Sequence, residues 1–167
     1  RQSVIEGVQI LVILGTGVVF IFWFHRCYRN LLAFGATKLR FGTGWAISSW
    51  FLPVLDFFMP KQIANDIWRG SSASSDGKSW NEPVPGFLLA WWLVWTAGFT
   101  IDSGLWRSFD ETVLTIDDLQ SQLKWLIASD MLLSLAALLA IVVVRRLTER
   151  QEERASALSQ QAAAPAP

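Results

Sequence analysis

The chain has 167 residues, of which 52% are hydrophobic, and its formal net charge at pH 7 is zero. This balance gives no electrostatic reason to expect nucleic acid as a partner, and no basic–aromatic binding pattern occurs. Cysteine and histidine occur once each, as Cys27 and His25. An intrachain disulfide is therefore excluded, and a Cys/His metal cluster is disfavoured. We expect no metal and no cofactor held by this chain alone.

Hydrophobic residues gather in three blocks, at about 4–24, 87–106 and 124–144. Each block has about 20 residues, which at roughly 1.5 Å per residue matches a hydrocarbon core about 30 Å thick. A buried helix of a soluble protein would be shorter and would carry a charged stripe. The pattern predicts an all-α integral membrane bundle with three spans in this chain.

The region between the first two spans is more varied. Residues 25–40 are expected to continue the first span as a helix along the membrane surface. The apolar run 43–60 contains Pro53, where a helix must bend or break, and Asp56, and it stops at Pro60. Residues 61–69 predict a second surface helix. The basic residues of the two surface helices are Arg26, Arg29, Lys38, Arg40, Lys61 and Arg69.

The segments that follow are polar. Residues 70–86 are rich in Ser, Gly and Pro and predict a loop. We predict that the membrane domain comprises residues 1–148. Residues 149–167 are expected to form a charged helical extension and a disordered Ala/Pro tail.

The distribution of Lys and Arg decides between two topologies. If 43–60 crossed the membrane, the best orientation would place eight basic residues inside and six outside. If it enters and returns on the same side, eleven lie inside and three outside. The second arrangement obeys the positive-inside bias better. We therefore predict a re-entrant or interfacial hairpin broken at Pro53, with the 61–86 loop and the C-terminal tail in the cytoplasm.

The aromatic and proline-containing segment resembles a group of bacterial membrane proteins catalogued only as a domain of unknown function. The resemblance covers most of the chain. Its residues are Trp23, Tyr28-Arg29-Asn30, Gly35, Leu39-Arg40-Phe41, Gly44-Trp45-Ala46, Trp50-Phe51, Pro53, Pro60, Ile67-Trp68-Arg69, Val144-Arg145-Arg146-Leu147-Thr148 and Arg150-Gln151-Glu152.

That resemblance implies the plasma membrane of a bacterium, a further hydrophobic helix before Arg1, and both ends in the cytoplasm. It supplies no activity. Members of the group often carry Asn where this chain has Asp56, so the resemblance does not imply an obligatory carboxylate there.

Polar residues inside the predicted membrane region are the candidate site residues. Glu6, Gln9, Asp102 and Asp130 have overlapping predicted depths and should turn towards one another. They would form either a polar contact that orients the helices or an outward-facing site for a cation or proton.

Two further polar residues, Asp56 and His25, each have an expected role and an alternative one. Asp56 is expected to cap free backbone donors or to pair with Arg26, Arg29 or Lys61, with an ion or proton site as the alternative. His25 is expected to be an interfacial polar residue; the alternative is a ligand to a pigment or haem iron supplied by a larger complex.

Three classes of function remain open. The first is a non-enzymatic accessory or scaffold subunit that packs against a membrane-protein partner, because the sequence has no nucleophile–base set, phosphate loop or metal cluster. The alternative is a small homo-oligomeric transporter or ion-coupling protein that uses the intramembrane acids. A membrane-embedded enzyme ranks last.

Overall fold

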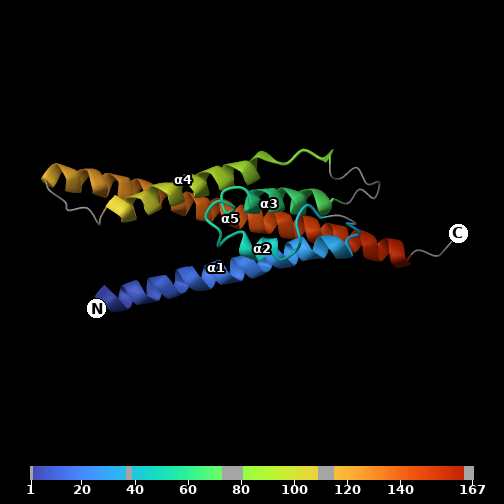
Figure 1. The fold of residues 1–167 in the computed structure, drawn as a ribbon. Helices are drawn as coiled ribbons and strands as arrows, with labels where there is room; N and C mark the ends of the chain where they lie inside the picture. Colours follow the sequence, from blue (N-terminus) through green and yellow to red (C-terminus); the bar gives the residue numbers. More distant parts are fainter. Residues whose placement is uncertain (1, 37–38, 73–80, 109–114, 164–167) are drawn as a thin grey trace. The chain divides into compact units, whose positions relative to one another are not determined.

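The computed structural model describes residues 2–36, 39–72, 81–108 and 115–163, and its described regular structure is α-helical, with no strand (Figure 1). The helices are α1 (Gln2–Ala33), α2 (Trp45–Ser48), α3 (Met59–Gly70), α4 (Gly86–Ser108) and α5 (Ile116–Ala163). The predicted all-α class is confirmed for these residues. Two compact units form: 1–82 with 147–167, and 83–146. Helix α5 contributes to both.

Helix α1 is a single helix of 32 residues, about 48 Å long. The predicted span 4–24 and the predicted surface helix 25–40 are therefore one continuous element, and it ends at Ala33 rather than at residue 40. Gly35 ends it with φ +93°, a left-handed conformation that glycine adopts without strain. The amides of Gly35 and Ala36 then donate to the carbonyls of Leu32 and Leu31, at 3.2 and 3.0 Å.

The segment 43–60 contains no helix of membrane-spanning length. Helix α2 has four residues, and residues 49–58 form turns. Short-range backbone bonds hold these turns, such as the Asp56 amide donating to the Leu52 carbonyl at 2.9 Å. Pro53 lies in the turns, where its missing N–H breaks no helical hydrogen bond. Helix α3 then begins at Met59 with Pro60 in its first turn, a favoured position for proline.

The core of the first unit lies on one face of α1. Phe24, Tyr28 and Leu31 are fully buried on this face, at the spacing of successive helical turns. The ring of Trp50 meets Phe24 edge-on at 5.7 Å between centroids, a favourable geometry that holds the segment after α2 against α1. Helix α3 contributes the fully buried Ile63 and Ile67.

Close helix packing marks the second unit. Gly98 of α4 lies against α5, because a Cβ atom placed there would be 3.0 Å from Leu133 Cδ2 and 3.2 Å from Leu132 Cβ. Along α4, the ring of Trp95 stacks between those of Trp92 and Phe99, with centroids 5.2 and 5.4 Å apart.

Helix α5 has 48 residues and is about 72 Å long, more than twice the thickness of a hydrocarbon core. Its start is stabilised by Thr115, whose hydroxyl accepts from the Asp118 amide at 3.2 Å and donates to the Asp118 carboxylate at 2.6 Å. The helix continues to Ala163, well into the tail that the sequence predicted to be disordered, since Ala and Gln favour helix. Residues 164–167 lie outside the described residues.

Two helices are long and apolar enough to cross a membrane, by length and composition: Gly7–Ala33 in α1 and α5. Only 6% and 17% of their most apolar stretches are buried. A core helix of a soluble protein would instead be mostly buried, whereas Leu11 is 71% and Val19 69% exposed. Helix α4, the third predicted span, is about 34 Å long, but it is not one of the two helices that meet this test of length and composition.

Candidate functional site

A group of connected polar side chains lies in the first unit, where the C-terminal parts of α1, α3 and α5 meet. Gln151 of α5 is 6% exposed and binds three groups. Its Nε2 donates to the backbone carbonyl of Cys27 at 2.8 Å and to Ser71 Oγ at 3.3 Å, and its Oε1 accepts from Asn30 Nδ2 at 3.0 Å. A buried amide with its hydrogen bonds formed fixes the positions of the groups around it.

Arg150, the neighbour of Gln151, ties the segment after α3 to α5. Its Nε donates to the Trp68 carbonyl at 2.9 Å, and its guanidinium carbon lies 4.2 Å from the centroid of the Trp68 ring, a cation–π contact. The guanidinium also pairs with the Glu82 carboxylate. Glu82 accepts further bonds, from Ser72 Oγ at 2.6 Å and, through its carbonyl, from Arg69 Nε at 3.1 Å. We call the side chains of Gln151, Arg150, Asn30 and Glu82 the polar clamp.

Contacts between α1 and α5 show that the two helices run parallel in the first unit. Trp23 Nε1 donates to Thr148 Oγ1 at 3.2 Å. One to two turns further along both helices, Asn30 binds Gln151, and Arg154 donates to the Phe34 carbonyl at 3.4 Å. Residue numbers rise together on the two helices, as parallel packing requires.

A second polar contact joins α3 to the turn after α1. The Tyr28 hydroxyl donates to the Phe41 carbonyl and accepts from the Phe41 amide, both at 3.1 Å, and so folds this turn back onto α1. Arg40 lies 3.4 Å from an Asp66 carboxylate oxygen and donates to Gln62 at 3.2 Å.

The Asp66 side chain is fully buried, and among the described residues neither of its oxygens accepts a hydrogen bond. Burial raises the pKa of Asp66, although the Arg40 and Arg69 guanidinium groups act in the opposite direction.

The basic residues predicted for the membrane surface have different surroundings. Arg26 and Arg29 are exposed on α1, and Lys61 is half-buried. Arg40 and Arg69 bind Asp66 and Glu82 as described above. Lys38 lies outside the described residues.

Asp56 was expected to cap a helix or to pair with a nearby base. Its side chain is 8% exposed, and one carboxylate oxygen is buried without a partner among the described residues. The N-cap residue of α3 is Phe58, and no side chain caps the helix, so Asp56 does not cap it. No ion pair to Arg26, Arg29 or Lys61 occurs in the described part of the chain. Pro53 and Pro60 flank Asp56 in the turns and at the start of α3, and His25 is half-buried on α1.

The four predicted intramembrane polar residues belong to different units. Gln9 is exposed on α1, while the Glu6 side chain is outside the described residues. In the second unit, Asp102 is half-buried on α4 and Asp130 is exposed on α5, and no hydrogen bond joins them in the described structure. The predicted cluster therefore stays a prediction.

The polar clamp and Asp66 were not predicted from the sequence. Arg150, Gln151 and Arg154 lie in a stretch with as many acids as bases, a composition typical of a solvated helix surface. The available signal was a second buried stripe, because Leu147, Gln151 and Arg154 recur at helical spacing.

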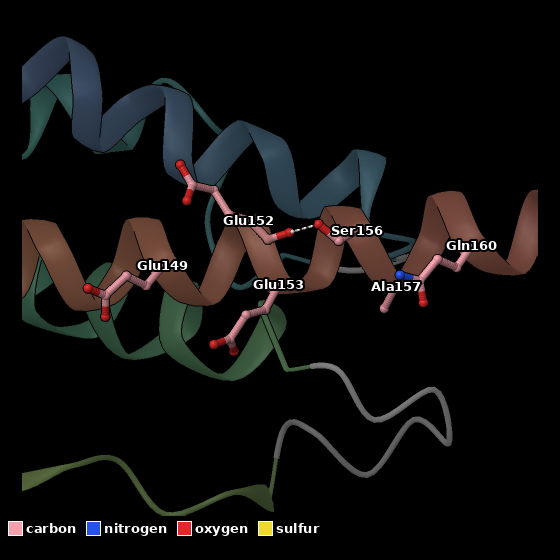
Figure 2. Close-up of a pocket in the computed structure, with 6 residues that line it drawn as sticks. All are labelled: Glu149, Glu152, Glu153, Ser156, Ala157 and Gln160. Atoms are coloured by element: carbon pink, nitrogen blue, oxygen red, sulfur yellow. Dashed lines mark hydrogen bonds between the residues drawn. The ribbon is translucent and has the colours of Figure 1, made fainter.

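The exposed side of the same part of α5 is acidic. A shallow pocket of about 510 Å³ is lined by Glu149, Glu152, Glu153, Ser156, Ala157 and Gln160 (Figure 2). The Ser156 hydroxyl donates to the Glu152 carbonyl at 2.9 Å, an ordinary contact within a helix. No group of three His, Cys, Asp or Glu side chains suited to a metal ion occurs in the described parts of the chain.

A family model for a domain of unknown function, DUF4328, matches residues 1–149. The chain belongs to this family. The match includes all of the residues 1–148 predicted as the membrane domain and confirms the resemblance to a family of unknown function. Gln151 and Arg154 of the first unit lie beyond the matched residues. No curated protein matches the chain. No solved structure matches it either.

Proposed function

We propose that this DUF4328 protein is a non-enzymatic integral membrane protein that serves as an accessory or scaffold subunit for a membrane-protein partner. The observation that carries the proposal is the exposure of the apolar side of α1. Val4, Leu11 and Val19 are each at least 66% exposed, and the most apolar stretch of the helix is almost unburied. Such a surface needs lipid or an apolar partner around it.

The polar clamp supports a bracing role. Its hydrogen bonds join α1, the end of α3 and α5, and they occupy donors and acceptors that a substrate would otherwise use. It contains no arrangement of a nucleophile and a base. A rigid unit of this kind holds helices in place for a partner.

The parallel contact between α1 and α5 supports three spans. The clamp lies beyond the apolar stretches of both helices, so both helices leave the membrane on the same side. The chain must then cross an odd number of times between the end of α1 and the start of α5. Helix α4 supplies one crossing. A second full crossing by 43–60 would make the number of crossings even and would start α5 on the wrong side of the membrane. The turns at 49–58 favour a hairpin that enters and returns, or lies at the surface.

The positive-inside bias places the clamp in the cytoplasm, because the segments that flank it carry most of the Lys and Arg. Helix α3 would then lie at the inner interface of a bacterial plasma membrane, where basic side chains gain from anionic lipid.

The alternative is a small oligomeric transporter or ion-coupling protein. Asp130 favours it, since an exposed acid in an apolar helix is typical of ion and proton paths. A substrate path would need helices from more than one copy of the chain.

Purification in a mild detergent distinguishes the two. A stoichiometric partner of different sequence that stays bound through size-exclusion chromatography is expected for the scaffold. A preparation that contains only copies of this chain and catalyses ion movement in vesicles would favour transport. As a matched control, Val19→Asn should weaken partner binding, whereas Gln160→Asn on the tail of α5 should not.

A further inference from the structure

Helix α5 presents two different faces in the second unit. Ser129, Ala136 and Val143, spaced seven residues apart, are buried. On the opposite face, Met131 is 69% and Leu138 62% exposed. An exposed stripe with a period close to seven residues has the form of a helix-packing seam.

A groove lies on this exposed face. Its volume is about 410 Å³, and it is lined by Ile127, Asp130, Met131, Ser134, Leu135 and Leu138. Asp130 and Ser134 are exposed, and neither has a hydrogen-bond partner among the described residues. They are four residues apart and so lie one above the other on the helix.

This surface is unfavourable in lipid alone. A carboxylate at membrane depth has no water to bind and requires a donor from protein. The groove itself supplies an acceptor, Asp130, and a donor, the Ser134 hydroxyl. Apolar lipid chains offer no hydrogen bond to the Asp130 acceptor or to the Ser134 donor.

We propose that this groove is the contact surface for a second copy of the chain, with Asp130 of each copy accepting a hydrogen bond from Ser134 of the other. This inference rests on the proposed membrane location, though not on the presence of another partner. Two copies inserted in one membrane have the same orientation, so a two-fold axis along the membrane normal brings equal residues to equal depth. A donor and an acceptor on one face are then complementary to a second copy of that face. A foreign helix would need a matching donor at the same depth by coincidence.

Disulfide cross-linking in isolated membranes tests the contact. In a Cys27→Ala background, Leu138→Cys places a thiol in the groove, and Leu139→Cys places one on the half-buried side of α5 away from Asp130 as a control. Oxidation with copper phenanthroline should join two Leu138→Cys chains in high yield, because the Cα atoms across a parallel seam come within disulfide range. The Leu139→Cys chains should give at most a minor product. Equal yields at the two positions, or a Leu138→Cys adduct with a protein of different sequence, would overturn the proposal.

Variants at Asp130 test the chemistry. Asp130→Leu removes both hydrogen bonds of a symmetric pair and should weaken self-association about tenfold, measured by sedimentation in detergent. Asp130→Asn keeps an acceptor for Ser134 and should retain the dimer. A dimer that Asp130→Leu leaves unchanged would refute the role of the acid.

The two proposals can fail separately. If the chain is absent from the membrane fraction, the proposed function fails and the self-association fails with it. If it is present there and the yields at 138 and 139 are equal, only the self-association fails.

Discussion

Gln151 donates a hydrogen bond to the backbone carbonyl of Cys27 at 2.8 Å, across a separation of 124 residues in the sequence. This bond joins the helix that contains the last apolar block to the helix that contains the first. The same side chain also engages Asn30 and Ser71. One residue thereby connects α1, α5 and the end of α3.

Replacing Gln151 tests the importance of this connection. Gln151→Ala leaves the Asn30 amide without its buried partner, and unsatisfied buried polar groups cost about 1–3 kcal/mol each. We expect the free energy of unfolding in detergent to fall by about that amount. The control is Gln160→Ala, the same substitution at an exposed site of α5, where a change within about 0.5 kcal/mol is expected. Equal effects at 151 and 160 would show that the clamp contributes nothing to stability.

Gly70 tests the packing between α3 and α1. A Cβ atom there would lie 2.9 Å from Leu31 Cδ2, and Leu31 is fully buried. Overpacking of this kind costs about 1–3 kcal/mol and should outweigh the gain in helix propensity of Gly70→Ala, which is at most about 1 kcal/mol. Thermal unfolding of the purified protein measures the loss.

The comparison for that substitution is Gly44→Ala, since nothing lies within 4 Å of a Cβ at Gly44. Shortening the obstructing side chain provides a second check. In a Leu31→Ala background, Gly70→Ala should cost less than in the natural chain. The same cost in both backgrounds would mean that the two helices do not touch there.

Asp66 should make stability depend on pH. Because burial raises the pKa of Asp66, the folded protein holds its proton to higher pH than the unfolded chain does. The contribution of this residue is therefore most favourable below the ordinary aspartate pKa of about 4, and it is lost as pH rises towards the folded pKa. Unfolding from pH 4 to 8 should show a decline that Asp66→Asn reduces.

Replacing Arg40 tests the direction in which its guanidinium shifts the pKa of Asp66. The Arg40 guanidinium lowers the pKa of Asp66, so Arg40→Gln should raise that pKa further and extend the decline to higher pH. A natural chain that instead becomes more stable than Asp66→Asn as pH increases would mean that the ion pair outweighs the cost of burial.

The three-span topology predicts which segments face the cytoplasm. In intact cells, single cysteines that replace Ser75 and Ser159 in a Cys27→Ala background should resist an impermeant maleimide, whereas a cysteine that replaces Asp118 should react. Permeabilised cells provide the control, because all three should then react. Labelling at 75 but not at 159 in intact cells would indicate a full crossing by 43–60 and would exclude the three-span count.

Much of the secondary structure could be predicted from the sequence, because helix formation depends on local patterns. The apolar blocks gave the long helices, and the proline at position 60 marked the start of α3. The helix ends were less predictable. The end of α1 depends on the left-handed conformation of Gly35. The prediction of a surface helix to residue 40 did not include this conformation. The extension of α5 to Ala163 reflects helix propensity carried onward from a stable helix.

The candidate site was harder to predict. The composition of the segment after Val144 is that of a solvated helix, and the local signal that distinguishes Gln151 from Gln160 is its helical spacing with Leu147 and Arg154. Only the packing of α1 beside α5 buries the first and exposes the second. Asp66 likewise becomes a buried carboxylate because Arg40, 26 positions earlier, returns to it through the turn held by Tyr28 and Phe41. The sequence by itself determined which segments are helical and apolar, since these depend on neighbouring residues. The tertiary structure decided which polar groups lose water and pair, because that depends on contacts between residues far apart in the chain.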